Sequence, residues 1–164
     1  MTYAAEDQLP SWTKKDFLYH YKHKKSQIVK LHEIGHLEKV IYHAKTYNQA
    51  EADGGTIFQR VEKDVIKNAR KNGEGSFSYD FINSYEFQPI IFSVGGATVS
   101  GAGIVNVIDK EDFWLVTTYI NYSFLDYFTD PYDLWDFFPI DINTGDPYYI
   151  TGSWKTSIEA IIKK

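Results

Sequence analysis

The chain has 164 residues and no cysteine, with 43% hydrophobic and 24% charged residues. This composition is typical of a globular protein with room for one domain, and it excludes disulfides and thiolate metal sites. The net charge is −5, with 13 Lys/Arg against 9 Asp/Glu in residues 1–71 and 4 against 13 in residues 72–164. Binding a phosphate backbone needs clustered cations, so we expect no nucleic-acid partner.

The start of the chain, "MTYAAEDQLPSW", lacks the basic and apolar regions of a signal peptide. We therefore expect no export signal in this chain, although delivery as part of a longer protein stays open. The uncharged run of residues 89–108 contains Ser, Thr, Asn and Gly and is weakly hydrophobic for a membrane-spanning helix. We expect strand glycines there, at a bulge or a close backbone approach, and no transmembrane segment.

Three helices are predicted before residue 73. The first lies in "SWTKKDFLYHYKHKK", after an N-cap at Ser11 or Thr13. The second runs from Ser26 to about Tyr47, where apolar residues recur at helical spacing. The third follows Thr56 as its N-cap and ends before Gly73.

The remaining residues are rich in strand-forming side chains and turn signals. Residues 76–96, 97–107 and 112–124 favour strands, and the last two flank the polar turn "IDKE" as a β-hairpin. "PYYITGSW" predicts another strand, and "KTSIEAIIKK" a strand or a short helix. The expected fold is α+β: three N-terminal helices (the helical region, 1–72) followed by an antiparallel sheet (73–164), either open or partly closed into a barrel. We expect the two regions to form one compact unit.

The segment "HEIGH" matches the zinc-protease pattern H-E-x-x-H. On a helix, His32 and His36 would share one face and reach one zinc ion, with Glu33 as the general base that activates water. Only about 30 residues precede this motif, and no third ligand is evident. A polar stripe of histidines on the predicted helix is the competing interpretation, and zinc hydrolysis is kept as an alternative function.

An acidic and aromatic segment follows the predicted hairpin. "FLDYFTDPYDLWDFFPIDINTGDPYYITGSW" holds six aspartates and no basic residue before Lys155. Carboxylates beside rings that exclude water can hold a hard cation such as Mg²⁺ or Ca²⁺, or supply an acid or base. A solvated acidic loop with Asp-Pro turns is the alternative structural interpretation.

The order of a glycine-rich strand, a turn, an aromatic strand and then "FTDPYDLWDF" resembles the C-terminal toxin domains of bacterial polymorphic toxins. More specifically, it resembles the activity domain of colicin M-type bacteriocins, which carries an Asp-x-Tyr-Asp element after a β-hairpin. Asp130, Tyr132 and Asp133 match that element within about residues 94–154. This chain lacks the basic His/Arg element that follows it in the family.

The resemblance implies an antibacterial toxin domain, secreted or delivered into a target bacterium and acting in its periplasm. It further implies metal-dependent cleavage of the lipid II pyrophosphate linkage and a cognate immunity protein. The catalytic residues would be Asp130, Tyr132 and Asp133, with Asp126 and Asp136 as further ligands of a divalent metal (Mg²⁺ or Ca²⁺). A third class of function stays open, a non-enzymatic binding or immunity-type protein whose acidic, aromatic face docks on a basic partner.

Overall fold

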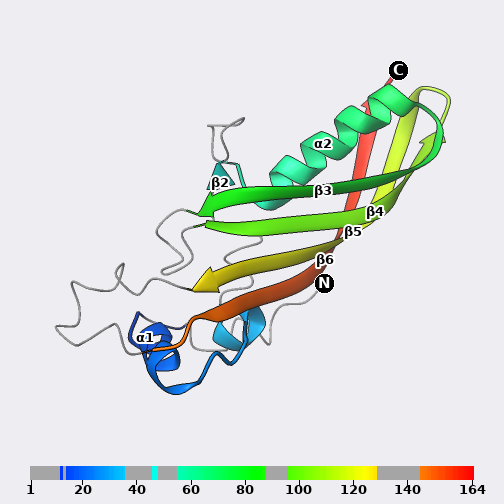
Figure 1. Ribbon diagram of the computed structural model, residues 1–164. Helices are drawn as coiled ribbons and strands as arrows, with labels where there is room; N and C mark the ends of the chain where they lie inside the picture. The colour runs from blue at the N-terminus through cyan, green and yellow to red at the C-terminus, as the bar shows by residue number, and fades with distance from the viewer. Residues whose placement is uncertain (1–11, 13, 36–45, 48–54, 88–95, 129–144) are drawn as a thin grey trace.

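The structure, a computed structural model, describes residues 12, 14–35, 46–47, 55–87, 96–128 and 145–164. Four long strands form an antiparallel meander: β3 (Gly75–Phe87), β4 (Gly96–Asp109), β5 (Phe113–Phe128) and β6 (Tyr148–Lys163). Short strands complete the edges, because β1 (Val29–Lys30) pairs in parallel with β6 and β2 (Thr46–Tyr47) pairs antiparallel with β3. The sheet order β1-β6-β5-β4-β3-β2 is linear (Figure 1), so the sheet is mixed and open.

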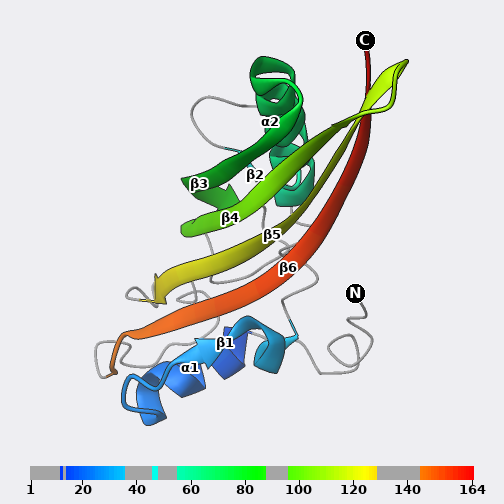
Figure 2. The same cartoon turned by 90° about the vertical axis from the view of Figure 1, so that its right-hand side faces the viewer.

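Helix α2 (Ile57–Asn72) lies against the concave face of this curved sheet (Figure 2). Thr56 caps its N-terminus in a capping box, in which Thr56 Oγ1 accepts from Gln59 N–H and Gln59 Oε1 accepts from Thr56 N–H. Gly73, with φ of +74°, ends the helix. These are the boundaries that the sequence predicted, because both signals are local in the chain.

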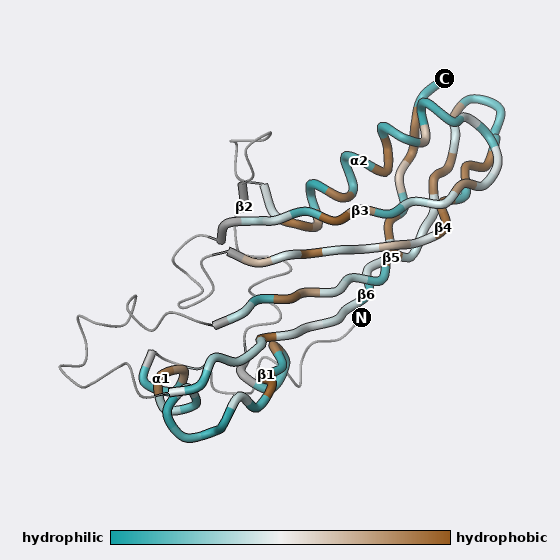
Figure 3. Tube along the Cα trace, viewed as in Figure 1, coloured by the Kyte–Doolittle hydropathy of each residue, from teal (hydrophilic) through white to brown (hydrophobic). Residues whose placement is uncertain are grey.

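The main core lies between α2 and the concave face. The hydrophobic turns of α2 face the strands and its polar turns face away (Figure 3). Its buried apolar residues recur every four positions, and alternate residues of each strand point toward them. The buried members are Ile57, Val61, Val65 and Ala69 of α2, with Tyr79, Val99, Val105, Val116, Ile120 and Ile158 of the strands.

A second part of the core lies at the β6 edge, where α1 (Lys14–His23) and β1 pack (Figures 1 and 2). Leu31 is fully buried there and lies over Gly152 of β6. A Cβ atom at Gly152 would come within 2.5 Å of Leu31 Cδ1, so this close approach requires glycine.

The predicted arrangement of three N-terminal helices followed by an antiparallel sheet, open or closed, is wrong. The described residues contain two α-helices, and the expected helix from Ser26 to Tyr47 is replaced at its start by β1 and a short 3₁₀ helix (Leu31–Ile34). Gly35 ends this 3₁₀ helix in the left-handed conformation, with φ of +69°. Val29 and Leu31 instead alternate into the core, and this burial outweighs the local helical spacing.

The described part of the glycine-rich run, from Gly96 onward, is a strand, as the sequence indicated. A Cβ atom at Gly103 of β4 would lie 2.2 Å from the carbonyl oxygen of Tyr119, and one at Gly101 would lie 2.4 Å from the Phe81 ring. Both glycines therefore mark close approaches rather than a phosphate loop. Within the described ranges, neither α-helix has the length and apolar character that a membrane crossing requires.

Candidate functional site

Asp126 is a carboxylic acid on the concave face of the sheet, the inner face, which is otherwise largely apolar. It lies near the end of β5, where it pairs with Ile150 of β6. Its Oδ1 accepts a hydrogen bond from the Tyr127 N–H at 2.8 Å, and its Oδ2 has no hydrogen-bond partner among the described residues. Burial raises the pKa of Asp126 to about 6, although the bond from Tyr127 opposes the shift.

Tyr148 is the main neighbour that the charge of Asp126 affects. This tyrosine begins β6, is almost fully buried and donates from its hydroxyl to Phe17 O of α1 at 3.2 Å. Its pKa is raised, first by burial and then by the negative charge of Asp126. His20 of α1 packs edge-on against the Tyr148 ring at 4.4 Å, and its Nε2 donates to Gln27 O. Asp126 therefore lies beside a rigid aromatic wall.

Further along the inner face, β5 and β6 supply a second aromatic group. The rings of Tyr122 and Trp154 stack with centroids 5.0 Å apart, and Thr156 Oγ1 donates to the Tyr122 hydroxyl at 2.9 Å. Trp154 Nε1 is buried and has no hydrogen-bond partner in the described part of the chain. Such a donor is costly to leave unpaired and is a feature of this face that stability alone does not explain.

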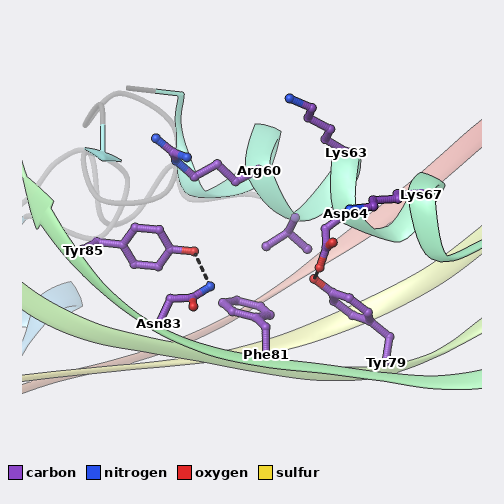
Figure 4. Close-up of a pocket in the computed structure, with 9 residues that line it drawn as sticks. Arg60, Lys63, Asp64, Lys67, Tyr79, Phe81, Asn83 and Tyr85 are labelled. Atoms are coloured by element: carbon purple, nitrogen blue, oxygen red, sulfur yellow. Dashed lines mark hydrogen bonds between the residues drawn. The ribbon is translucent and has the colours of Figure 1, made fainter. Parts of the chain in front are cut away.

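A polar pocket of about 330 Å³ opens on the same side of the sheet, between α2 and β3 (Figure 4). Figure 4 shows Arg60, Lys63, Asp64 and Lys67 on the helix, above four side chains that rise from β3. Those side chains come from alternate positions and therefore share one face of the strand. They are Tyr79, Phe81, Asn83 and Tyr85.

Two hydrogen bonds order the walls of this pocket. Tyr79 donates to Asp64 Oδ2 at 2.7 Å, and Asn83 Nδ2 donates to the Tyr85 hydroxyl at 3.3 Å. The pKa of Tyr79 is raised, first by burial and then by its bond to Asp64, so its hydroxyl stays protonated and donates. Arg60 is 9% exposed, and its Nε–H donates to Gly55 O at 3.2 Å.

The sheet register relates the pocket to Asp126. Tyr85 of β3 pairs with Ala97 of β4, and the next residue of β4, Thr98, pairs with Leu125, which precedes Asp126. Tyr85, Ala97 and Asp126 therefore follow one row across the inner face. Two strand spacings correspond to roughly 10 Å between the backbones of Tyr85 and Asp126.

Most of the predicted acidic site lies outside the described residues: Asp130, Tyr132, Asp133 and Asp136. The described strands show only where their segment is attached. It leaves β5 two residues beyond Asp126 and returns to β6 just before Tyr148. Of the aspartates predicted to bind a divalent metal, Asp126 is the one whose surroundings are described.

One oxygen of Asp126 fits the donor preference of Mg²⁺ or Ca²⁺, because Oδ2 carries no other hydrogen bond there. Among the described residues no group of three potential metal ligands occurs. A complete site would therefore need the other aspartates, and its geometry stays a prediction.

The α-helix predicted for the alternative zinc motif is replaced at its start by a short 3₁₀ helix. His32 and Glu33 lie in the 3₁₀ helix and are exposed, while His36 lies outside the described residues. Gly35, in the left-handed conformation, separates the two histidines. The motif requires both histidines on one continuous helix, and in the described part of the chain the 3₁₀ helix ends at Gly35.

Sequence reasoning missed the pocket. Its one available signal was Arg60, which falls on the otherwise apolar face of α2 between Ile57 and Val61. The alternation of Tyr79, Asn83 and Tyr85 predicted a strand but not what would lie above it.

Comparison with solved structures finds a likeness to pectocin M2, with a TM-score of 0.40 and 14% sequence identity over 93% of this chain. The chain spans 61% of the length of the pectocin M2 chain. No family model matches the sequence, and a search of curated proteins gives no significant match. A likeness of this size does not by itself assign the fold or the activity.

Proposed function

We propose that this chain is an antibacterial toxin domain that acts on the cell envelope. Its support is the Asp-x-Tyr-Asp element and the place where the described strands attach it. The β4–β5 hairpin predicted from the sequence is present, and the acidic segment follows directly from β5. The likeness to pectocin M2, a colicin M-like bacteriocin, lies in the same direction but is too distant to add weight.

The observation that carries the proposal is Asp126. This carboxyl group is half-buried, and one of its oxygens has no hydrogen-bond partner among the described residues. It lies at the start of a segment that holds five more aspartates, and such a group is costly to a fold and suited to chemistry. Asp126 belongs to β5, so the alternation of the strand directs its carboxyl group into the inner face of the sheet.

The finer proposal is metal-dependent hydrolysis of the lipid II pyrophosphate linkage. Asp130 and Asp133 bind the metal or activate water, and Tyr132 orients a phosphate oxygen. Asp126 and Asp136 supply further oxygen ligands, for which Mg²⁺ or Ca²⁺ is the chemically matched ion. The bound ion would neutralise charge on the phosphate group. A producing cell would need an immunity protein, and the substrate would be met in the periplasm of the target.

Expression in a test bacterium, with and without a periplasmic export signal, tests the general proposal. We expect growth loss and lysis only with export. The variants Asp130→Ala and Asp133→Ala should remove this toxicity, whereas Asp80→Ala, an exposed aspartate on the outer face of β3, should keep it. Circular dichroism of each purified variant establishes that it is folded.

Unchanged toxicity of folded Asp130→Ala and Asp133→Ala variants would reject the assigned residues. Absence of toxicity in both compartments would reject the toxin and favour a non-enzymatic binding protein. Release of pyrophosphate-linked product from purified lipid II, dependent on an added divalent metal, tests the finer proposal separately.

A further inference from the structure

The pocket between α2 and β3 has the charge of an anion-binding site. Three cationic side chains, Arg60, Lys63 and Lys67, line it against the single carboxylate of Asp64. Lys63 and Lys67 form no ion pair within the described residues, although the whole chain carries a net charge of −5. A local positive charge can attract a small anionic ligand, whereas the negative net charge of the whole chain repels large acidic partners.

The burial of Arg60 distinguishes this pocket from an ordinary solvated helix surface. Its side chain is buried, and the bond from Nε to Gly55 O fixes the orientation of the guanidinium group at the start of α2. Its planar set of donors matches the oxygens of a phosphate group.

The neutral donors of β3 extend this end of the pocket. Tyr85 and Asn83 rise from the strand on the same side as Arg60 (Figure 4), and their mutual hydrogen bond holds them in place. The Phe81 ring forms part of the floor, where it lies over Gly101 of β4. Because a Cβ atom at position 101 would displace that ring, glycine there helps to keep the pocket open.

Asp64 defines the other end. Its Oδ2 accepts from Tyr79, and its charge repels an anion. Its Oδ1 accepts only a long hydrogen bond from Asn68 Nδ2 within the described residues, at 3.5 Å, and can also accept from a ligand hydroxyl group. A ligand with a phosphate at one end and hydroxyl groups at the other satisfies both ends. A volume of about 330 Å³ is at the lower limit for small-molecule sites.

We propose that this pocket binds a small phosphate monoester that carries hydroxyl groups, with the phosphate on Arg60 and Lys63. The proposal does not depend on the antibacterial function, because it concerns binding by the purified protein. Soluble polyol phosphates and lipid headgroups share this chemistry. The recessed position of Arg60 favours the soluble form.

Isothermal titration calorimetry of the purified full chain with glycerol 3-phosphate tests the proposal, with inorganic phosphate and glycerol as partial probes. We expect saturable binding of glycerol 3-phosphate, weaker binding of inorganic phosphate and none of glycerol. The double variant Lys63→Gln/Lys67→Gln should weaken binding by about tenfold or more, because it removes the charge-assisted contact of Lys63 to the phosphate and the nearby positive charge of Lys67. Tyr85→Phe, which changes no charge, should weaken it about threefold or more.

Lys71→Gln is the matched control, since Lys71 is exposed on the same helix and outside the pocket. Equal weakening by Lys71→Gln, or no effect of Tyr85→Phe, would overturn the proposal in favour of general charge attraction. Absence of glycerol 3-phosphate binding would also overturn it. So would capture by vesicles of phosphatidylcholine and phosphatidic acid without binding of the soluble monoester, because the site would then be a membrane surface.

Discussion

Replacing Asp126 by Asn gives the most direct test of the inner-face site, because the carboxyl group should destabilise the fold when it is ionised. Its pKa is raised from 3.8 to about 6 by burial. The folded protein therefore holds this proton more tightly than the unfolded chain does. Stability should fall as the pH rises from about 4 to about 6, and the loss should be complete at neutral pH.

The size of this loss follows from the shift. Each pKa unit corresponds to about 1.4 kcal/mol, so the limiting cost is about 3 kcal/mol. Asp126 keeps some contact with solvent, which reduces the expected cost to about 2 kcal/mol. Asn keeps an oxygen that can accept from Tyr127 N–H and has no charge to desolvate. Asp126→Asn should thus raise the free energy of unfolding by about 2 kcal/mol at pH 7.5 and change it little at pH 4.

Urea denaturation between pH 4 and pH 8, in the presence of EDTA, measures this difference. Asp80→Asn is the control, because Asp80 is exposed on the outer face. A difference between Asp126→Asn and the native protein that stays constant with pH would refute the reasoning, since it would leave no contribution from ionisation. With millimolar Mg²⁺ or Ca²⁺ the pH step should move lower if Asp126 is a metal ligand, because a bound cation favours the carboxylate.

Two substitutions test the fold around the site, and a zinc measurement tests the alternative function. Thr56→Ala removes the capping box of α2 and should lower the free energy of unfolding by about 1 kcal/mol in the same urea assay. Gly152→Val places a side chain against Leu31 and should destabilise the protein by about 1–3 kcal/mol, whereas Ser153→Val on the exposed face should change the melting temperature little. Elemental analysis after incubation with zinc should find no stoichiometric zinc, because Gly35 interrupts the helix that His32 and His36 would need; a one-to-one content would restore the zinc alternative.

The elements that the sequence predicted correctly carry their own local signals. Thr56 and Gln59 form a cap from four consecutive residues, and the turn between β4 and β5 is polar and short. The segment after Ser26 shows the opposite case. Its apolar spacing was helical, but Val29 pairs with Ile150, a partner far along the chain that no local pattern reveals.

For the candidate site, too, the sequence indicated residue types but not the contacts that form on folding. Asp126 was predicted to be a metal ligand within the acidic and aromatic segment, and that role stays a prediction. Its pKa is raised by burial, and that burial exists only in the folded sheet. The α2–β3 pocket was missed entirely, since neither Arg60 nor Tyr85 has meaning as a site until the helix lies across the strand.

The distribution of polar groups over the two faces of the sheet favours the inner face as the place of function. The outer face carries Ser, Thr and Asn together with exposed residues such as Ile82 and Tyr119, and none of these costs much in water. On the inner face each polar group is expensive. Apolar side chains there would make a more stable fold than the carboxyl group of Asp126 and the indole N–H of Trp154.

Their arrangement adds to this argument. The row from Tyr85 through Ala97 to Asp126 puts the cationic pocket and the acidic group on one concave surface, with a small side chain between them. The cations come from the basic first part of the chain and the acids from the second, so the fold brings the two unequal charge distributions together. The basic partner that the acidic segment lacks in its own sequence is therefore better sought on α2, at Arg60 and Lys63, than among the histidines before residue 44.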